Sequence, residues 1–220
     1  MEVSTYSEFV QLVEKYKILP FSGFVPEYPS LSTAAVNDQW HTDTDADPWQ
    51  WRVKIVKDGV AAYGKFFGDK PCFIHKDLFP IVKTVLSLNK TVEDRFNDGE
   101  LSRTALQIFT IIIEQGNIDS RELRKKSGLN AKEDKKEYEK ALVDLQNYGY
   151  VVITGAAKQG EDDSGWSSMC YEPADIWFTS VNGSKEHVSI EDAKRLILVE
   201  LSQTCTDKSL KYFTKKLKLN

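Results

Sequence analysis

The sequence lacks long apolar runs, a cysteine framework and a signal-like N-terminus, and each absence excludes a class of protein. No stretch reaches the roughly 18 apolar residues that a membrane-spanning helix needs. The three cysteines, Cys72, Cys170 and Cys205, are too few and too far apart for a disulfide scaffold or a paired-cysteine zinc site. The first residues are acidic, whereas a signal peptide is basic and then apolar. We therefore expect a soluble, cytoplasmic protein with reduced thiols and no membrane partner.

A metal-ligand pattern is also missing. The three histidines stand far apart in the chain, at His41, His75 and His187. Alternating aspartates before Pro48 resemble the start of a calcium loop, but Pro48 stands where such a loop requires glycine. Asp47 followed by Pro48 instead predicts a helix N-cap and the first helical residue. We expect no metal and no cofactor.

What the chain does have is the composition of a globular protein, with 41% hydrophobic, 11% aromatic and 28% charged residues. Its 220 residues allow one domain or two small ones. The net charge of −4 argues against a generic nucleic-acid-binding domain, which is usually strongly basic. The positive charge is uneven along the chain, however, and segment 101–149 is the least acidic part.

The end of the chain is basic and amphipathic. Its lysines are Lys208, Lys211, Lys215, Lys216 and Lys218, with no acidic residue among them. Apolar residues recur between them at helical spacing, which predicts a helix that packs its apolar stripe on the body and leaves the lysines in water. A contact with phosphate or with anionic lipid is the alternative.

Residues 1–95 are predicted to form an N-terminal helix and hairpin region. A helix is expected over 4–17, an extended connection over the Pro-, Gly- and Ser-rich 18–39, and a helix from Pro48 to Gly59. Two strands joined at Gly68–Pro71 follow, and then a further helix that begins near 76.

Residues 100–180 carry the sharper pattern. A strongly apolar helix, a short helix that stops at Gly128, a longer helix that stops at Gly149 and two strands follow one another. This is the order of a winged helix-turn-helix. The predicted fold is therefore α+β and mostly helical, with a winged helix, the additional N-terminal helix and hairpin region, and a C-terminal helical segment, 181–220, that wraps the body.

Candidate nucleic-acid contacts follow from that order, because the third helix of a winged helix enters the major groove and the wing touches the backbone. They are Arg121, Arg124, Lys125 and Lys126 on the second helix, Lys132, Lys135 and Lys136 on the third, and Lys158 in the wing. Acidic residues interrupt both the third helix and the wing, where Glu161, Asp162 and Asp163 are consecutive. A winged helix that contacts another protein is therefore the alternative.

Three of the five tryptophans fall within twelve residues and suggest a ligand site. The candidate ligand-binding residues are Trp40, His41, Trp49, Trp51, Arg52, Tyr63 and Lys65. Trp49 and Arg52 share a helix face while Trp51 points elsewhere, so one tryptophan can wall a pocket for an anionic or planar ligand. The alternative is packing of the Pro-rich loop onto the helix and hairpin. No nucleophile and base can be paired from spacing.

Four stretches of the sequence carry a resemblance: WHTDTDADPWQWR, AAYGKFF, DLQNYGYVVI and GWSSMCYEPADIWF. With them, the chain resembles a family of small bacterial proteins related to the AlkZ-type winged-helix DNA glycosylases, over roughly residues 5–180. AlkZ-type enzymes remove alkylated or crosslinked purines with a pair of glutamines in a Q-x-Q-like motif. Here every glutamine stands singly, so no residue takes over the catalytic role.

Three functions follow as hypotheses. The first is a non-catalytic, nucleic-acid-associated protein related to DNA glycosylases, with duplex DNA as partner. The second is a module for protein interaction or small-ligand binding that uses the tryptophan-rich segment and does not bind DNA. The third is a glycosylase with a rearranged site. The sequence gives no oligomeric state.

Overall fold

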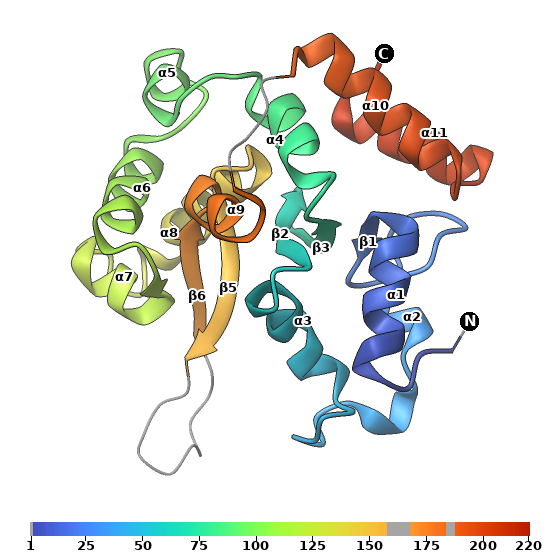
Figure 1. Ribbon diagram of the computed structural model, residues 1–220. Coiled ribbons are helices and arrows are strands. Elements are labelled where there is room, and N and C mark those ends of the chain that lie inside the picture. The colour runs from blue at the N-terminus through green and yellow to red at the C-terminus, as the bar shows by residue number, and fades with distance from the viewer. Residues whose placement is uncertain (1, 158–167, 184–187) are drawn as a thin grey trace.

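A computed structural model of the chain describes residues 2–157, 168–183 and 188–220 (Figure 1). It has an α+β fold that is mostly helical, with small antiparallel sheets, as the sequence analysis predicts. Lys158, the three wing acids and His187 lie outside the described residues. Among the described helices, none combines the length and the apolar character needed to cross a membrane.

The N-terminal helix α1 (Tyr6–Tyr16) forms where the sequence predicts it, because Thr5 and Glu8 make a capping box at its start. The following segment is more ordered than predicted. It contains strand β1 (Ile18–Pro20), helix α2 (Leu31–Ala34) and the 3₁₀ turn η1 (Asn37–Gln39). The expectation of an extended connection over 18–39 was thus only partly right, since pairing of β1 with a distant strand and a serine cap on α2 order this segment.

Helix α3 (Pro48–Lys57) starts at the predicted Asp47–Pro48 cap. The predicted hairpin follows as β2 (Ala61–Phe67) and β3 (Lys70–His75), and with β1 it makes a sheet of order β1-β3-β2. Helix α4 (Phe79–Ser87) comes next, as expected. The short helix α5 (Val92–Asn97), capped by Thr91, was not predicted.

The second half of the chain follows the predicted order of elements. It consists of α6 (Arg103–Gln115), β4 (Ile118–Asp119), α7 (Ser120–Lys126), α8 (Lys135–Asn147), β5 (Val151–Ala157) and β6 (Ser168–Pro173). The strands form a sheet of order β4-β6-β5. Helix α8 begins only at Lys135, because the Asp134 carboxylate accepts from the amide of Ala131 and holds a turn before the helix.

Three helices end the chain: α9 (Ala174–Asn182), α10 (Ile190–Ser202) and α11 (Asp207–Leu217). Helix α10 packs on α4, and both C-terminal helices lie beside the N-terminal half (Figure 1). Phe213 of α11 is fully buried, with its ring centroid 5.2 Å from that of Tyr28. The predicted docking of the amphipathic C-terminal helix is confirmed.

One buried side chain ties the two halves together. Arg95 of α5 is 2% exposed, and its Nη2 donates to the carbonyl oxygens of Leu86 (3.0 Å) and Ser87 (2.6 Å). Its Nε donates to the Tyr150 hydroxyl at 3.0 Å, and Glu100 forms an ion pair with Nη1. Because the buried guanidinium is so fully satisfied, it fixes the end of α4 against the start of β5.

The buried apolar side chains form one continuous cluster. It includes residues from every part of the described chain, such as Phe9, Ile112 and Phe213. The three segments 1–95, 100–180 and 181–220 therefore share one hydrophobic core. Their division into domains stays a prediction.

Candidate functional site

The tryptophan-rich segment is held by one carboxylate. Asp47 is buried and accepts hydrogen bonds from the backbone amides of His41 (3.0 Å), Asp43 (3.2 Å) and Trp49 (2.8 Å). The aspartates therefore make the predicted turn and helix cap. Across the residues that the structure describes, no three His, Cys, Asp or Glu side chains gather in a way that could hold a metal ion.

Phe21 is the centre of an aromatic cluster in this region. Its ring centroid lies 5.9 Å from that of Trp40, 6.1 Å from Trp49 and 6.3 Å from Tyr63. The rings of His41 and Trp49 are 5.2 Å apart. We call these five residues the aromatic cluster. Phe21 was not among the predicted site residues, because its Pro- and Gly-rich surroundings carry no periodic signal.

Arg52 lies beside the aromatic cluster and is only 2% exposed. Its guanidinium carbon is 3.7 Å from the ring centroid of Trp49, and its Nη1 donates to Sδ of Met169 in β6 at 3.1 Å. Its Nε is buried without a hydrogen-bond partner among the described residues. A buried donor left unpaired costs about 1–3 kcal/mol, so this nitrogen is an unfilled position for an acceptor.

Burial shifts the ionisation of this group and of its neighbour. The pKa of Arg52 is lowered by desolvation, an effect opposed by the nearby Tyr63 hydroxyl and by Asp47. Burial raises the pKa of Tyr63 to about 12, and the charge of Arg52 opposes that rise. Since an arginine remains protonated in proteins, the cluster presents a desolvated cation beside a neutral phenol.

The structure brings most of the predicted ligand-site residues together. As expected, Trp49 and Arg52 share a face of α3 while Trp51 points away. Trp51 is 1% exposed, its ring centroid lies 5.8 Å from that of Phe9, and its Nε1 donates to the Asp45 carbonyl. The backbone amide of Lys65 donates to Oε1 of Gln146 in α8.

Of the predicted nucleic-acid contacts, those within the described residues lie on α7, on α8 and in the turn between them. Arg124 is used inside the protein, because its Nε and Nη2 donate to the carbonyl oxygens of Leu129 (2.5 Å) and Ala131 (2.6 Å). Arg121 contacts Asp119, at 3.7 Å, and the Ser168 hydroxyl, at 3.0 Å. These two arginines therefore stabilise the turn and the sheet edge.

The lysines of this surface fall into two groups. Lys126 pairs with Glu122 at 3.6 Å, and Lys135 pairs with Glu139 at 3.7 Å. The others are exposed and form no ion pair with any residue in 2–157, 168–183 or 188–220: Lys125, Lys132 and Lys136. We call these three the unpaired α7–α8 lysines. A shallow hollow of about 650 Å³ on α7 includes Lys125 in its lining.

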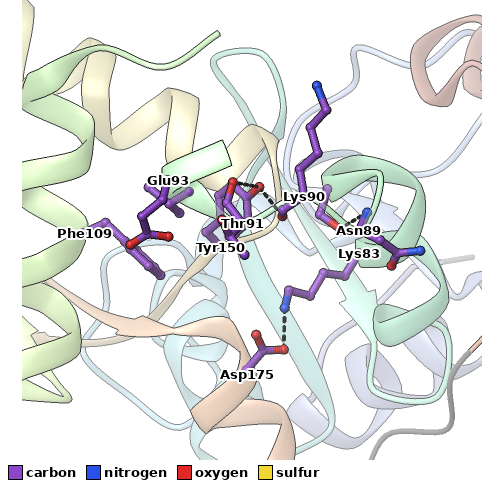
Figure 2. A pocket seen from close by; sticks show the side chains of 10 residues that line it. Lys83, Asn89, Lys90, Thr91, Glu93, Phe109, Tyr150 and Asp175 are labelled. Atoms are coloured by element: carbon purple, nitrogen blue, oxygen red, sulfur yellow. Dashed lines mark hydrogen bonds and ion pairs between the residues drawn. The ribbon is translucent and has the colours of Figure 1, made fainter. Parts of the chain in front are cut away.

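A polar pocket of about 490 Å³ lies where the two halves meet (Figure 2). Lys83 of α4 is 7% exposed and points at Asp175 of α9, with which it forms an ion pair. The Tyr150 hydroxyl donates to the Lys90 carbonyl at 2.7 Å, and Phe109 of α6 lines one side. Sequence reasoning missed this pocket, because its residues are spread over α4, α5, α6, β5 and α9.

These features define a mostly helical α+β protein with a lysine-bearing helix pair and a desolvated arginine beside an aromatic cluster. The chain belongs to the AlkZ-related family, whose profile matches residues 3–218. The resemblance stated from the sequence motifs is thereby confirmed.

Among solved structures, the chain is similar to the Streptomyces sahachiroi DNA glycosylase AlkZ, with 9% sequence identity and a TM-score of 0.44. The match covers 98% of this chain and 65% of that protein, so the chain spans just under two thirds of its length. A comparison with curated proteins gives no match.

Proposed function

We propose that this protein is a non-catalytic, DNA-associated protein that contacts duplex DNA through a winged helix formed by α6 to β6. The order helix, short strand, helix, helix and two antiparallel strands supports the winged-helix interpretation. Family membership supports DNA as the partner, because the AlkZ protein named above is a DNA glycosylase. The absence of a paired-glutamine motif from the sequence supports binding without catalysis.

The observation that carries the proposal is the state of the unpaired α7–α8 lysines. A surface lysine already paired with a carboxylate gains little from a phosphate, because the pair must first be broken. Lys125, Lys132 and Lys136 have no such competitor in the described part of the chain. Each can therefore neutralise a phosphate and release a counterion.

The test is fluorescence anisotropy of a labelled duplex against the protein over a range of salt concentrations. The slope of log K against log salt changes by about 0.9 for each phosphate contact. We expect the triple variant K125Q/K132Q/K136Q to bind more weakly and to lose about 2.7 from the steepness of that slope. Wild-type affinity and slope in this variant would contradict the proposal.

A matched control removes the same charge from another surface. The control variant is K15Q/K54Q/K76Q, whose three positions lie on α1, on α3 and after β3. It also changes the net charge from −4 to −7. This variant should bind DNA with the wild-type slope. An equal loss in both variants would show only the effect of net charge.

A second candidate function is favoured by the unpaired Nε of Arg52. A buried cation beside aromatic rings suits an anionic or planar small molecule, such as a nucleotide. Binding should change the tryptophan fluorescence, and Trp49→Phe should weaken it about tenfold, or by about 1.4 kcal/mol. Trp51→Phe is the control, because Trp51 faces the core. A panel of nucleotides and metabolites without any response would contradict this function.

A further inference from the structure

Helix α11 carries two lysines of interest, and a third stands at its C-cap. Lys211, Lys215 and Lys218 follow one another at i, i+4 and i+7, and all three are exposed. Together with Thr214 and Asn220 they line a shallow hollow with a volume of about 510 Å³. We call these three lysines the α11 ridge. The aromatic cluster, the α7–α8 surface and the polar pocket do not include them.

The ridge has no internal counter-charge in the described structure. Lys208, one turn earlier, pairs with Glu27 at 2.5 Å, and Lys194 of the neighbouring α10 pairs with Glu191 at 3.8 Å. No ion pair joins the ridge lysines to any carboxylate within the ranges described. The sequence itself contains no acidic residue from 208 to 220. The ridge is thus a concentrated positive surface on a chain whose net charge is −4.

The opposite side of α11 is committed to the core. Phe213, Leu217 and Leu219 are between 0% and 4% exposed. A helix that binds a membrane surface inserts its apolar face into the lipid, and α11 has already buried that face in the protein. The partner of the ridge is therefore an anionic one that the lysine ammonium groups can bind without an apolar contact. The buried apolar side chains hold the helix, and with it the spacing of these lysines, in place.

We propose that the α11 ridge is a second phosphate-contacting surface for duplex DNA. Its three lysines extend over about 10 Å of helix axis, a length along which a duplex carries about six negative charges. The choice of duplex DNA over other polyanions rests on the proposed function. In Figure 1, α11 lies at the upper right and α7 at the left, so the helix that carries the ridge is well separated in this view from α7.

The test compares K211Q/K215Q/K218Q with wild-type protein, with K125Q/K132Q/K136Q and with the control K15Q/K54Q/K76Q. The three ridge and the three control substitutions each bring the net charge from −4 to −7. We expect the ridge variant to lose about 2.7 from the steepness of log K against log salt, and the control to lose none. The thermal midpoint of the ridge variant should equal that of wild type, because the changed side chains are exposed.

The outcomes separate the ridge from the α7–α8 surface. A wild-type slope in the ridge variant with a loss in the α7–α8 variant would overturn the ridge and leave the proposed function standing. The reverse result would support the ridge and overturn contact through α7 and α8. No binding of a labelled duplex by wild-type protein at about 50 mM salt would overturn both. Ridge-dependent binding to phosphatidylserine vesicles without any binding to duplex would also overturn the inference.

Discussion

The two halves of the chain are built in the same order and present different surfaces. In each, a helix is followed by a short strand, two further helices and a hairpin. The last strand lies at the centre of a three-stranded antiparallel sheet, in the order β1-β3-β2 in the first half and β4-β6-β5 in the second. The helix before the hairpin is α3 in one half and α8 in the other.

These two helices differ in what covers them. Most of α3 is buried, and it packs on β2 and also on β5 of the second half. The first half of α8 carries lysines and glutamates and is exposed apart from Tyr138, and the helix packs against β2 and α6. The helix before the hairpin is thus mostly a packing element in the first half, as α3, and carries a charged surface in the second half, as α8. The two halves therefore differ in the surface they expose and not in the order of their elements.

Removing a large side chain from α3 should give the largest loss of stability. Trp51→Ala deletes a buried ring that packs on Phe9 and donates to the Asp45 carbonyl. We expect a loss of about 3–5 kcal/mol in the free energy of unfolding, measured by urea denaturation. Lys136→Ala on the exposed part of α8 should change it by less than about 0.5 kcal/mol. Similar losses in the two variants would break the comparison.

Disrupting the ion pair that joins the halves should have an intermediate effect. Asp175→Asn leaves the Lys83 ammonium buried without its charged partner. We expect a loss of about 1–3 kcal/mol in the same assay, the cost of an unpaired buried polar group. Adding Lys83→Met should restore much of it, because the double variant buries no charge. A double variant no more stable than Asp175→Asn would argue that the pair does not join the halves.

Lowering the pH should reduce the stability of the fold through a residue of the first half, His75. The central strand β3 ends in the buried His75, whereas the corresponding β6 ends in Pro173. Burial lowers the pKa of His75 below 6.5, and the amide of Asp77 donates to its Nδ1, which suits the neutral ring. Below pH 6.5 the imidazole of His75 therefore binds a proton more readily in the unfolded chain than in the native protein.

Stability should accordingly fall as the pH drops from about 6.5, by at most about 1.4 kcal/mol per pH unit for this one group. Urea unfolding at pH 7.5 and at pH 5.5 measures the difference. In His75→Gln the difference should shrink, since the carboxylates titrate as before while the buried imidazole is gone. An unchanged difference would remove His75 as the cause.

The smallest effect is expected on the exposed face of α8. Lys135→Ala removes an i, i+4 ion pair with Glu139 in which both side chains are well over half exposed. We expect a loss of about 0.3–0.5 kcal/mol in a thermal or urea denaturation experiment. A loss above about 1 kcal/mol would show that this face contributes to packing after all.

Much of the fold can be predicted from local signals. Asp47–Pro48 gives the start of α3, and the turn at Gly68 gives the hairpin, because caps and turns are set by neighbouring residues. Strands β1 and β4 were not predicted, since each has only two or three residues and exists because a distant strand pairs with it. The sheet order shared by the two halves could not be seen without them.

The candidate sites were predictable to a different degree. The shared face of Trp49 and Arg52 follows from helical spacing and is confirmed. The burial of Arg52 could not be predicted, because it depends on Met169, more than one hundred residues away. Ion pairing divides the lysines of α7 and α8 into two groups, a division that composition alone does not give. The DNA contacts and the cytoplasmic location stay predictions.

The packing of α10 on α4 also has a consequence for how the protein is made. Phe79 and Val82 of α4 are fully buried, and α10, whose Ala193 and Ile197 are also fully buried, follows about one hundred residues later in the chain. At a synthesis rate of about 5–20 residues per second, α10 is synthesised about 5–20 s after α4. On the ribosome, α4 is therefore a surface that a chaperone would meet before the protein is complete.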